Sequence, residues 1–147
     1  MTQPLEVLLV EDNEGDVEMV REALEDQTPP CNLSVTKNGR EALDHLFKHG
    51  IFQDAATPQL IFLDLNMPGM DGKILLKLIR QEEQLKTIPV VVLTSSRAPS
   101  DIMETYVDHT NCYIVKPFDS KEFKSAIRLT IDFWKNVAQL PNGAAAL

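Results

Sequence analysis

Short, almost wholly apolar segments recur along the chain, and apolar residues return every three or four positions in the segments between them. A short apolar run predicts a buried strand, whereas the wider spacing predicts one face of a helix. The predicted strands are residues 5–10, 32–36, 59–63, 89–94 and 112–115. The last three are apolar at nearly every position, which is typical of strands covered on both faces of a sheet.

The helical spacing follows each of the first four strands. The apolar positions that carry it are Val17, Val20 and Leu24, then Leu43, Leu46 and Phe47, then Ile74, Leu75, Leu78 and Ile79, and finally Met103, Tyr106 and Val107. A last helix is predicted near residues 121–140, with a core stripe through Phe123, Ile127 and Trp134. Strict alternation of strand and helix predicts an α/β fold with a parallel sheet, helices on both faces, and a ligand crevice beyond the carboxyl ends of the strands.

The last predicted helix also carries a second apolar row. It consists of Leu129, Phe133, Val137 and Leu140, and at 3.6 residues per turn it lies roughly 90° from the core stripe. An apolar surplus on a surface helix often marks an interface. We therefore expect this row to form a homodimer or partner contact, with burial by the tail or a neighbouring helix as the alternative.

Composition narrows the function classes. The 147 residues include 22 acidic and 14 basic side chains, for a net charge of −8, and such a surface repels nucleic acids and anionic membranes. No apolar run approaches the roughly 20 residues that span a bilayer, and the N-terminus lacks the basic region of a secretory signal. We expect one cytoplasmic domain over residues 1–147, with a core at about 5–139 and a short tail at 140–147, and reduced thiols at Cys31 and Cys112.

Charged and hydroxyl residues occur where the predicted strands end. Glu11 and Asp12 follow the first strand, Asp64 follows the third, Thr94 ends the fourth, and Lys116 follows the fifth. Two carboxylates 4 Å apart repel by about 4 kcal/mol at an effective dielectric constant near 20, so a cation is expected among them. Carboxylate ligands with room for water suit Mg²⁺. A single Asp after a strand is usually a turn residue or a helix cap, but four of the five strand ends carrying such residues favour a site.

At these positions the chain resembles a known family. The segments VLLVEDNEGD, LIFLDLNMPGMDG, VVVLTSS and YIVKPF are similar, in that order, to the four signature blocks of response-regulator receiver domains of two-component signalling. The resemblance implies a flavodoxin-like (βα)₅ three-layer sandwich with strand order 2-1-3-4-5. It also implies transfer of a phosphoryl group from a histidine kinase to Asp64, with Mg²⁺ as the cofactor.

The resemblance also implies roles for the other matching residues. Asp12 would bind Mg²⁺ directly, Glu11 would act through water, and Asn66 would supply a backbone carbonyl oxygen. Thr94 and Tyr113 match the switch hydroxyl and the switch aromatic residue, and Lys116 matches the phosphate-binding lysine. The resemblance further implies a cis peptide bond between Lys116 and Pro117.

Phosphorylation of Asp64 adds about −1.5 to −2 charge. We expect Thr94 to move toward the phosphoryl group and Tyr113 to turn inward, which would change the face formed by the fourth helix, the fifth strand and the fifth helix. The segments NCYIVKP and FWKNVAQLP are similar to those of stand-alone regulators that serve bacterial phytochrome histidine kinases. That likeness implies such a kinase as the partner and a homodimer as the assembly.

The sequence leaves two alternative classes of protein to consider. A Mg²⁺-dependent phosphohydrolase also forms an aspartyl-phosphate, but the expected DxD pair after the first strand is missing, because Asp12 is followed by Asn13 and Glu14. A docking module that is never phosphorylated has no need to hold so many like charges together. Both classes therefore fit the residues less well than a phosphoacceptor does.

Overall fold

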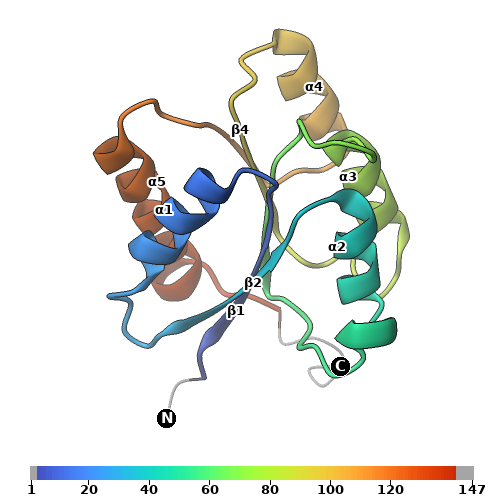
Figure 1. Ribbon diagram of the computed structural model, residues 1–147, viewed down its shortest axis with the longest axis horizontal. Helices are drawn as coiled ribbons and strands as arrows, with labels where there is room; N and C mark the ends of the chain where they lie inside the picture. Colours follow the sequence, from blue (N-terminus) through green and yellow to red (C-terminus); the bar gives the residue numbers. More distant parts are fainter. Residues whose placement is uncertain (1–2, 142–147) are drawn as a thin grey trace.

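A computed structural model describes residues 3–141 of the chain. Its centre is a sheet of five parallel strands in the order β2-β1-β3-β4-β5 (Figure 1). The strands are β1 (Leu5–Val10), β2 (Cys31–Thr36), β3 (Leu60–Leu63), β4 (Val90–Thr94) and β5 (Cys112–Val115). Each predicted strand is therefore present with its ends within one residue of the expected positions, and the predicted strand order is confirmed.

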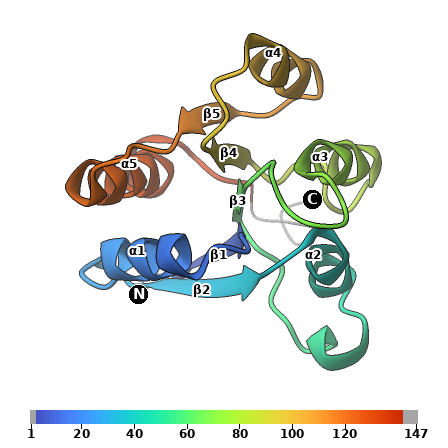
Figure 2. The same cartoon turned by 45° about the horizontal axis from the view of Figure 1, so that its top comes forward.

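Five α-helices connect or follow the strands. They are α1 (Glu14–Leu24), α2 (Gly39–Leu46), α3 (Gly72–Gln81), α4 (Pro99–Val107) and α5 (Ser120–Asp132), and a 3₁₀ turn, η1 (Gly50–Phe52), precedes β3. Helices α1 and α5 cover one face of the sheet, and α2 and α3 cover the other (Figure 2). The predicted α/β sandwich of three layers is therefore observed, with one hydrophobic core on each side of the sheet.

Asparagine or aspartate side chains cap the N-termini of α1, α2, α3 and α5, next to the carboxyl edge of the sheet. The Asn13 side chain accepts a hydrogen bond from Asp16 N at the start of α1, and Asp71 accepts one from Lys73 N at the start of α3. Asp119 caps α5 in the same way. Because each cap satisfies a backbone N–H that the helix leaves unpaired, the first turns of α1 and α3 are ordered beside the strand ends.

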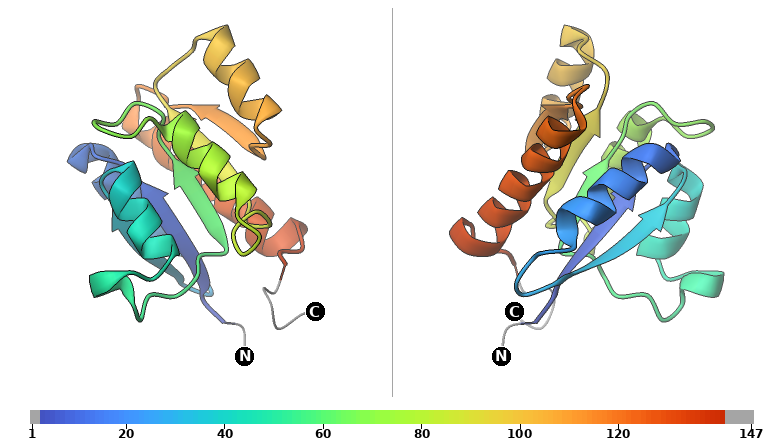
Figure 3. Two further views of the ribbon diagram at one scale, coloured as in Figure 1. Left: turned by 90° about the vertical axis from the view of Figure 1, so that its right-hand side faces the viewer. Right: turned by 60° about the vertical axis from the view of Figure 1, so that its left-hand side comes forward.

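The end of the last helix differs from the expectation of a regular helix to residue 140. Helix α5 ends at Asp132 and continues as a π-helical turn, η2 (Phe133–Val137), which closes with a hydrogen bond from Ala138 N to Phe133 O of 2.8 Å. The backbone is extended at Ala138, where the chain turns away from the axis of the helix (Figure 3). A π turn is wider than an α turn, so a 3.6-residue period no longer describes positions beyond it.

The bond between Lys116 and Pro117 is trans, so the predicted cis bond is wrong. Within residues 3–141 the cis peptide bond is Thr28–Pro29. The trans form of an X–Pro bond is favoured by about 0.5–1 kcal/mol. Backbone hydrogen bonding between Lys116 N and Thr94 O already directs residue 116 over the end of the sheet, so no cis bond is needed to bring its side chain there.

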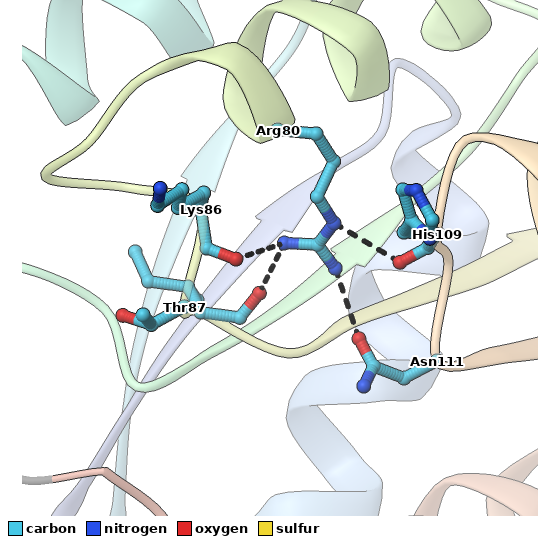
Figure 4. Close-up of a pocket in the computed structure, with 6 residues that line it drawn as sticks. Arg80, Lys86, Thr87, His109 and Asn111 are labelled. Atoms are coloured by element: carbon cyan, nitrogen blue, oxygen red, sulfur yellow. Dashed lines mark hydrogen bonds between the residues drawn. The ribbon is translucent and has the colours of Figure 1, made fainter.

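Arg80 joins three segments at the amino edge of the sheet, the edge opposite to the carboxylates (Figure 4). Its guanidinium donates hydrogen bonds to His109 O, Lys86 O, Ile88 O and Asn111 Oδ1, at 2.8 to 3.1 Å. Asn111 Oδ1 also accepts a bond from Val90 N. The end of α3, the start of β4 and the start of β5 are thus connected through one side chain.

Replacement of Arg80 by Met should lower the free energy of unfolding by about 2–3 kcal/mol, because the apolar side chain leaves backbone carbonyls without their donor. Urea denaturation measures the change. Lys86→Met is the matched control, since the Lys86 amine pairs with Glu83 at the surface and such pairs contribute about 0–1 kcal/mol. Equal midpoints for the two variants would contradict the role of Arg80.

Two further expectations concern membrane-spanning helices and the two cysteines. Within the described residues, no helix has the length and apolar character of a membrane span. Cys31 and Cys112 are free, half-buried thiols on β2 and β5, and burial raises the pKa of both. The prediction that both cysteines occupy partly buried strand positions is therefore confirmed.

Candidate functional site

The register of the sheet brings the first residues after β1, β3 and β5 to one edge. Val10 lies opposite Leu63 in the β1–β3 pair, so Glu11 and Asp64 leave adjacent strands at the same level. Asp64 N bonds to Val10 O at 3.1 Å, and Lys116 N bonds to Thr94 O at 2.8 Å. These bonds extend the sheet by one residue and aim the side chains that follow into a common hollow.

Three carboxylates form a compact cluster in this hollow. Glu11, Asp12 and Asp64 each offer an oxygen atom, and these oxygens all lie within 4.8 Å of one another. Glu11 and Asp64 are almost fully buried, whereas Asp12 is exposed. The sequence prediction that the acidic residues of β1 and β3 converge is confirmed.

The Lys116 amine lies among the carboxylates. Its Nζ is 2.7 Å from Glu11 Oε1, 2.7 Å from Asp16 Oδ2 and 3.4 Å from Asp64 Oδ2. Burial alone would lower the pKa of Lys116, but the bonds to Asp16 and Glu11 and the charge of Asp64 outweigh it and raise the pKa above its usual value. The ammonium is therefore charged throughout the neutral range.

Burial has the opposite effect on the pKa of Glu11. Its burial is the largest effect and raises the pKa, Asp64 adds repulsion, and Lys116 offsets part of both, so the pKa of Glu11 rises from 4.5 to about 7. One ammonium shared by three carboxylates does not fully compensate a buried anion. The protonated form of Glu11 is therefore more favourable here than it is for a glutamate in water.

Asp16 belongs to this cluster and was missed by the sequence reasoning, which considered only strand ends. It lies in the first turn of α1, where its backbone N–H bonds to the cap residue Asn13. A usable signal was present, because the first turn of a helix that follows a parallel strand lies at the carboxyl edge of the sheet. An acidic residue three positions after a capping Asn could therefore have been assigned to the site.

The cluster has the chemistry of a divalent-cation site. Glu11 Oε1 is buried and has no partner in hydrogen-bond geometry, although it lies close to the Lys116 ammonium. A buried carboxylate oxygen with spare lone pairs, beside two other carboxylates and an open hollow, fits a hard cation that keeps some of its water. The residues present therefore fit Mg²⁺ or a similar ion.

The remaining predicted site residues lie along the neighbouring loops. Asn66 is exposed, and its Nδ2 lies 3.5 Å from the hydroxyl of the buried Thr94. The half-buried Tyr113 donates a hydrogen bond to Ser96 O at 2.9 Å. Ser96 N also donates to the Thr94 hydroxyl oxygen, so Thr94 and Tyr113 both contact Ser96.

The loop that carries Asp64 and Asn66 packs closely against α3. A Cβ atom at Gly72 would lie 2.4 Å from Asp64 O, so only glycine fits at this position. Gly69 has a positive φ of 83°, a conformation that glycine adopts without a steric penalty. These two glycines determine how closely the Asp64 loop approaches the first turn of α3.

The predicted interface row is only partly exposed. Leu129, Phe133 and Val137 are 68%, 48% and 75% exposed. Leu140 lies beyond the π turn and packs against the core between the sheet, α1 and α5. The inclusion of Leu140 in an exposed row is therefore wrong, because the helical period ends before it.

The fold and the site together define a receiver domain. Residues 7–128 match the family described as the response regulator receiver domain, and the chain belongs to that family. Its members act in two-component signalling, and a phosphorylation mechanism is typical of them.

Among similar proteins is the response regulator Rcp1 of Synechocystis, which is 37% identical over 138 residues, 94% of each chain. The crystal structure of the Mn²⁺-bound form of Rcp1 has a TM-score of 0.89 at 37% identity, over 94% of this chain and 99% of that one. The phosphorylated cyanobacterial phytochrome response regulator RcpA has a TM-score of 0.93 at 37% identity, over 95% of this chain and 100% of that one.

Proposed function

We propose that the chain acts as one receiver domain over residues 1–147, which accepts a phosphoryl group from a histidine kinase onto Asp64 with Mg²⁺ as the cofactor. The observation that carries this proposal is the position of the Asp64 carboxylate, which lies within 4.8 Å of the Glu11 and Asp12 carboxylates and 3.4 Å from the Lys116 amine. An acceptor, a cation site and a phosphate-binding amine therefore occupy one hollow.

The reaction would transfer the phosphoryl group between two nucleophiles. A carboxylate oxygen of Asp64 attacks phosphorus, the P–N bond to the kinase histidine breaks, and the histidine nitrogen keeps the electron pair. A divalent ion held by Asp12, Asp64, Glu11 and the Asn66 carbonyl would supply neutralising charge. Lys116 would exchange its contact with Asp64 for a phosphoryl oxygen.

The test of this proposal is phosphoryl incorporation from a small acyl-phosphate donor, measured by intact mass. The parent protein should gain one phosphoryl group in Mg²⁺ and none in EDTA, and Asp64→Asn should gain none, because an amide is not nucleophilic enough. Asp54→Asn is the control, since Asp54 is exposed and does not belong to the carboxylate cluster, and it should be labelled like the parent. Labelling of Asp64→Asn at the parent rate would disprove the assignment, and rapid turnover of small phosphate esters would favour a phosphohydrolase.

We further propose a phytochrome-type histidine kinase as the partner and the cytoplasm as the compartment. The support for the kinase is the similarity to Rcp1 and to the phytochrome response regulator RcpA. The net charge of −8 disfavours binding to DNA and to anionic membranes. In this role the protein is a phosphoacceptor rather than an enzyme, and its output is a change in the face formed by α4, β5 and α5. Thr94 would bond to the phosphoryl group and Tyr113 would follow it.

We also propose that Leu129, Phe133 and Val137 on the outside of the last helix form a homodimer contact. Their exposure leaves an apolar strip beside the face that would carry the output. Sedimentation of the parent should then show a dimer, and Phe133→Glu should shift it toward the monomer by burying a charge in the contact. A monomeric parent, both unmodified and phosphorylated, would contradict this contact.

A further inference from the structure

The Lys116 side chain is held between two elements of the fold. The backbone of Lys116 is fixed at the end of β5 by the bond from its N–H to Thr94 O, and its Nζ donates a hydrogen bond of 2.7 Å to Asp16 Oδ2 in the first turn of α1. Both side chains are largely covered, with Lys116 11% and Asp16 19% exposed, and charge-assisted bonds of this length are the stronger ones in proteins. The ammonium is therefore anchored to α1 as well as to β5.

The contacts of the Lys116 amine with the buried carboxylates are of a different kind. Glu11 Oε1 is also 2.7 Å from Nζ, but this oxygen has no partner in hydrogen-bond geometry. The bond from Nζ to Asp64 Oδ2 is long, at 3.4 Å. The short and well-directed hydrogen bond of the ammonium thus goes to Asp16, and Glu11 Oε1 keeps its lone pairs.

Asp16 does not belong to the group of carboxylates that fits a cation. The oxygens that lie within 4.8 Å of one another come from Glu11, Asp12 and Asp64. A divalent cation among them has to share Glu11 and Asp64 with the Lys116 ammonium, and the two positive charges repel each other. An ammonium that is bonded to Asp16 competes less for these carboxylates than one that is free to turn toward them.

We propose that Asp16 is a positioning residue of the cation site: it takes the directed hydrogen bond of the Lys116 ammonium and so leaves the Glu11 and Asp64 carboxylates available to a divalent cation. This inference rests on the proposed function, which needs the ammonium and the cation in one hollow. Without Asp16, the ammonium would turn toward Glu11 and Asp64, and an incoming cation would have to displace it.

The first test uses Mn²⁺ alone as the probe, with its dissociation constant measured from the electron paramagnetic resonance signal of the free ion. Asp16→Asn should bind Mn²⁺ about tenfold more weakly than the parent, which is the usual effect of residues that orient metal ligands. Glu14→Gln is the matched control, because it removes the same charge from the same turn of α1, but Glu14 is 84% exposed and pairs with Lys37. Its affinity should stay within about twofold of the parent, since exposed charges are screened by salt.

A second measurement separates positioning from the mere loss of a negative charge. In a Lys116→Met background no ammonium competes for the carboxylates, so Asp16→Asn should weaken Mn²⁺ binding no more than Glu14→Gln does. The effects of the changes at residues 16 and 116 should therefore be strongly non-additive. An equally large loss on Asp16→Asn in both backgrounds would mean that Lys116 is not involved, and would overturn the proposal.

A third readout needs neither a bound cation nor a change at Lys116. In the metal-free parent and in Glu14→Gln, the Nζ protons of Lys116 should give an NMR signal that is protected from exchange with water. In Asp16→Asn this signal should be lost or shifted, because the directed bond is gone. An unprotected Lys116 signal in the parent, or an unchanged signal in Asp16→Asn, would contradict the anchoring of the ammonium.

The failure of this inference is distinct from the failure of the proposed function. Equal binding of Mn²⁺ by Asp16→Asn and Glu14→Gln would overturn the role of Asp16 and leave Asp64 as the acceptor. A parent protein that binds no Mn²⁺, and gains no phosphoryl group in Mg²⁺, would overturn both.

Discussion

Replacement of Lys116 by Met should destabilise the metal-free protein by about 3 kcal/mol at pH 8, because removing one member of a buried ion pair leaves the other charge uncompensated. The Lys116 amine is the shared partner of Glu11 and Asp64, which are almost fully buried, and of Asp16. The loss should shrink at pH 5.5, where Glu11 can be protonated, and in Mg²⁺, which would supply the missing positive charge. Urea denaturation under these conditions measures it.

Lys37→Met provides the control for Lys116→Met. Lys37 also pairs with an acidic residue near the start of α1, Glu14 at 3.3 Å, but both side chains are exposed, and pairs of that kind contribute about 0–1 kcal/mol. The Lys116 variant should also lose most phosphoryl incorporation, whereas the Lys37 variant should keep it. If Lys116→Met were as stable as Lys37→Met at pH 8 in EDTA, the account of the cluster as a charge-strained site would fail.

In EDTA, the free energy of unfolding should fall as the pH rises from about 5 to 7.5. The pKa of Glu11 is about 7 in the folded protein, and in the unfolded chain it returns to its ordinary value of 4.5. Between these values the folded protein binds the extra proton, so raising the pH removes a proton that favours folding. The full effect is of order 3 kcal/mol, at 1.36 kcal/mol per pKa unit. Mg²⁺ favours the carboxylate and should flatten the dependence.

The comparison that isolates this effect is between the parent and Glu11→Gln, which has no titrating group at the position. It is needed because burial lowers the pKa of His45. The contribution of His45 to the free energy of unfolding therefore grows as the pH rises toward 6.5, which is opposite in sign to the contribution of Glu11. The charge of Lys116 is constant over this range, since its pKa is raised. The difference between the two proteins should decline with pH in EDTA, and a difference that grows with pH would contradict the raised pKa of Glu11.

Much of the fold was predictable from local pattern. Apolar runs predicted each strand to within one residue. For β3 and β4, which are buried at every position, the reason is that a strand covered on both faces permits no polar residue between its ends. The order of the strands and the convergence of Glu11, Asp64, Thr94 and Lys116 then followed from the family resemblance and from the rule that the carboxyl ends of parallel strands share an edge. The caps at Asp71 and Asp119 were also readable, since a short polar side chain before a helical pattern satisfies its first amides.

Contacts between distant segments were not predictable in this way. Asp16 reaches Lys116 across 100 positions of sequence, Arg80 joins the end of α3 to the loops before β4 and β5, and Lys73 pairs with Asp101 on another helix. Each contact depends on the direction of a long side chain and on the spacing of packed elements. Periodicity carries no information about either.

The sequence alone therefore determined the elements, their order and the residue types at the end of the sheet, because these depend on burial and on backbone preferences that act over a few residues. Only the tertiary structure decided that Lys116–Pro117 is trans, that Leu140 turns inward after a π turn, and that Asp16 shares the Lys116 amine. Those outcomes depend on small free-energy differences between alternatives that are all locally allowed. Packing against distant parts of the chain selects among them.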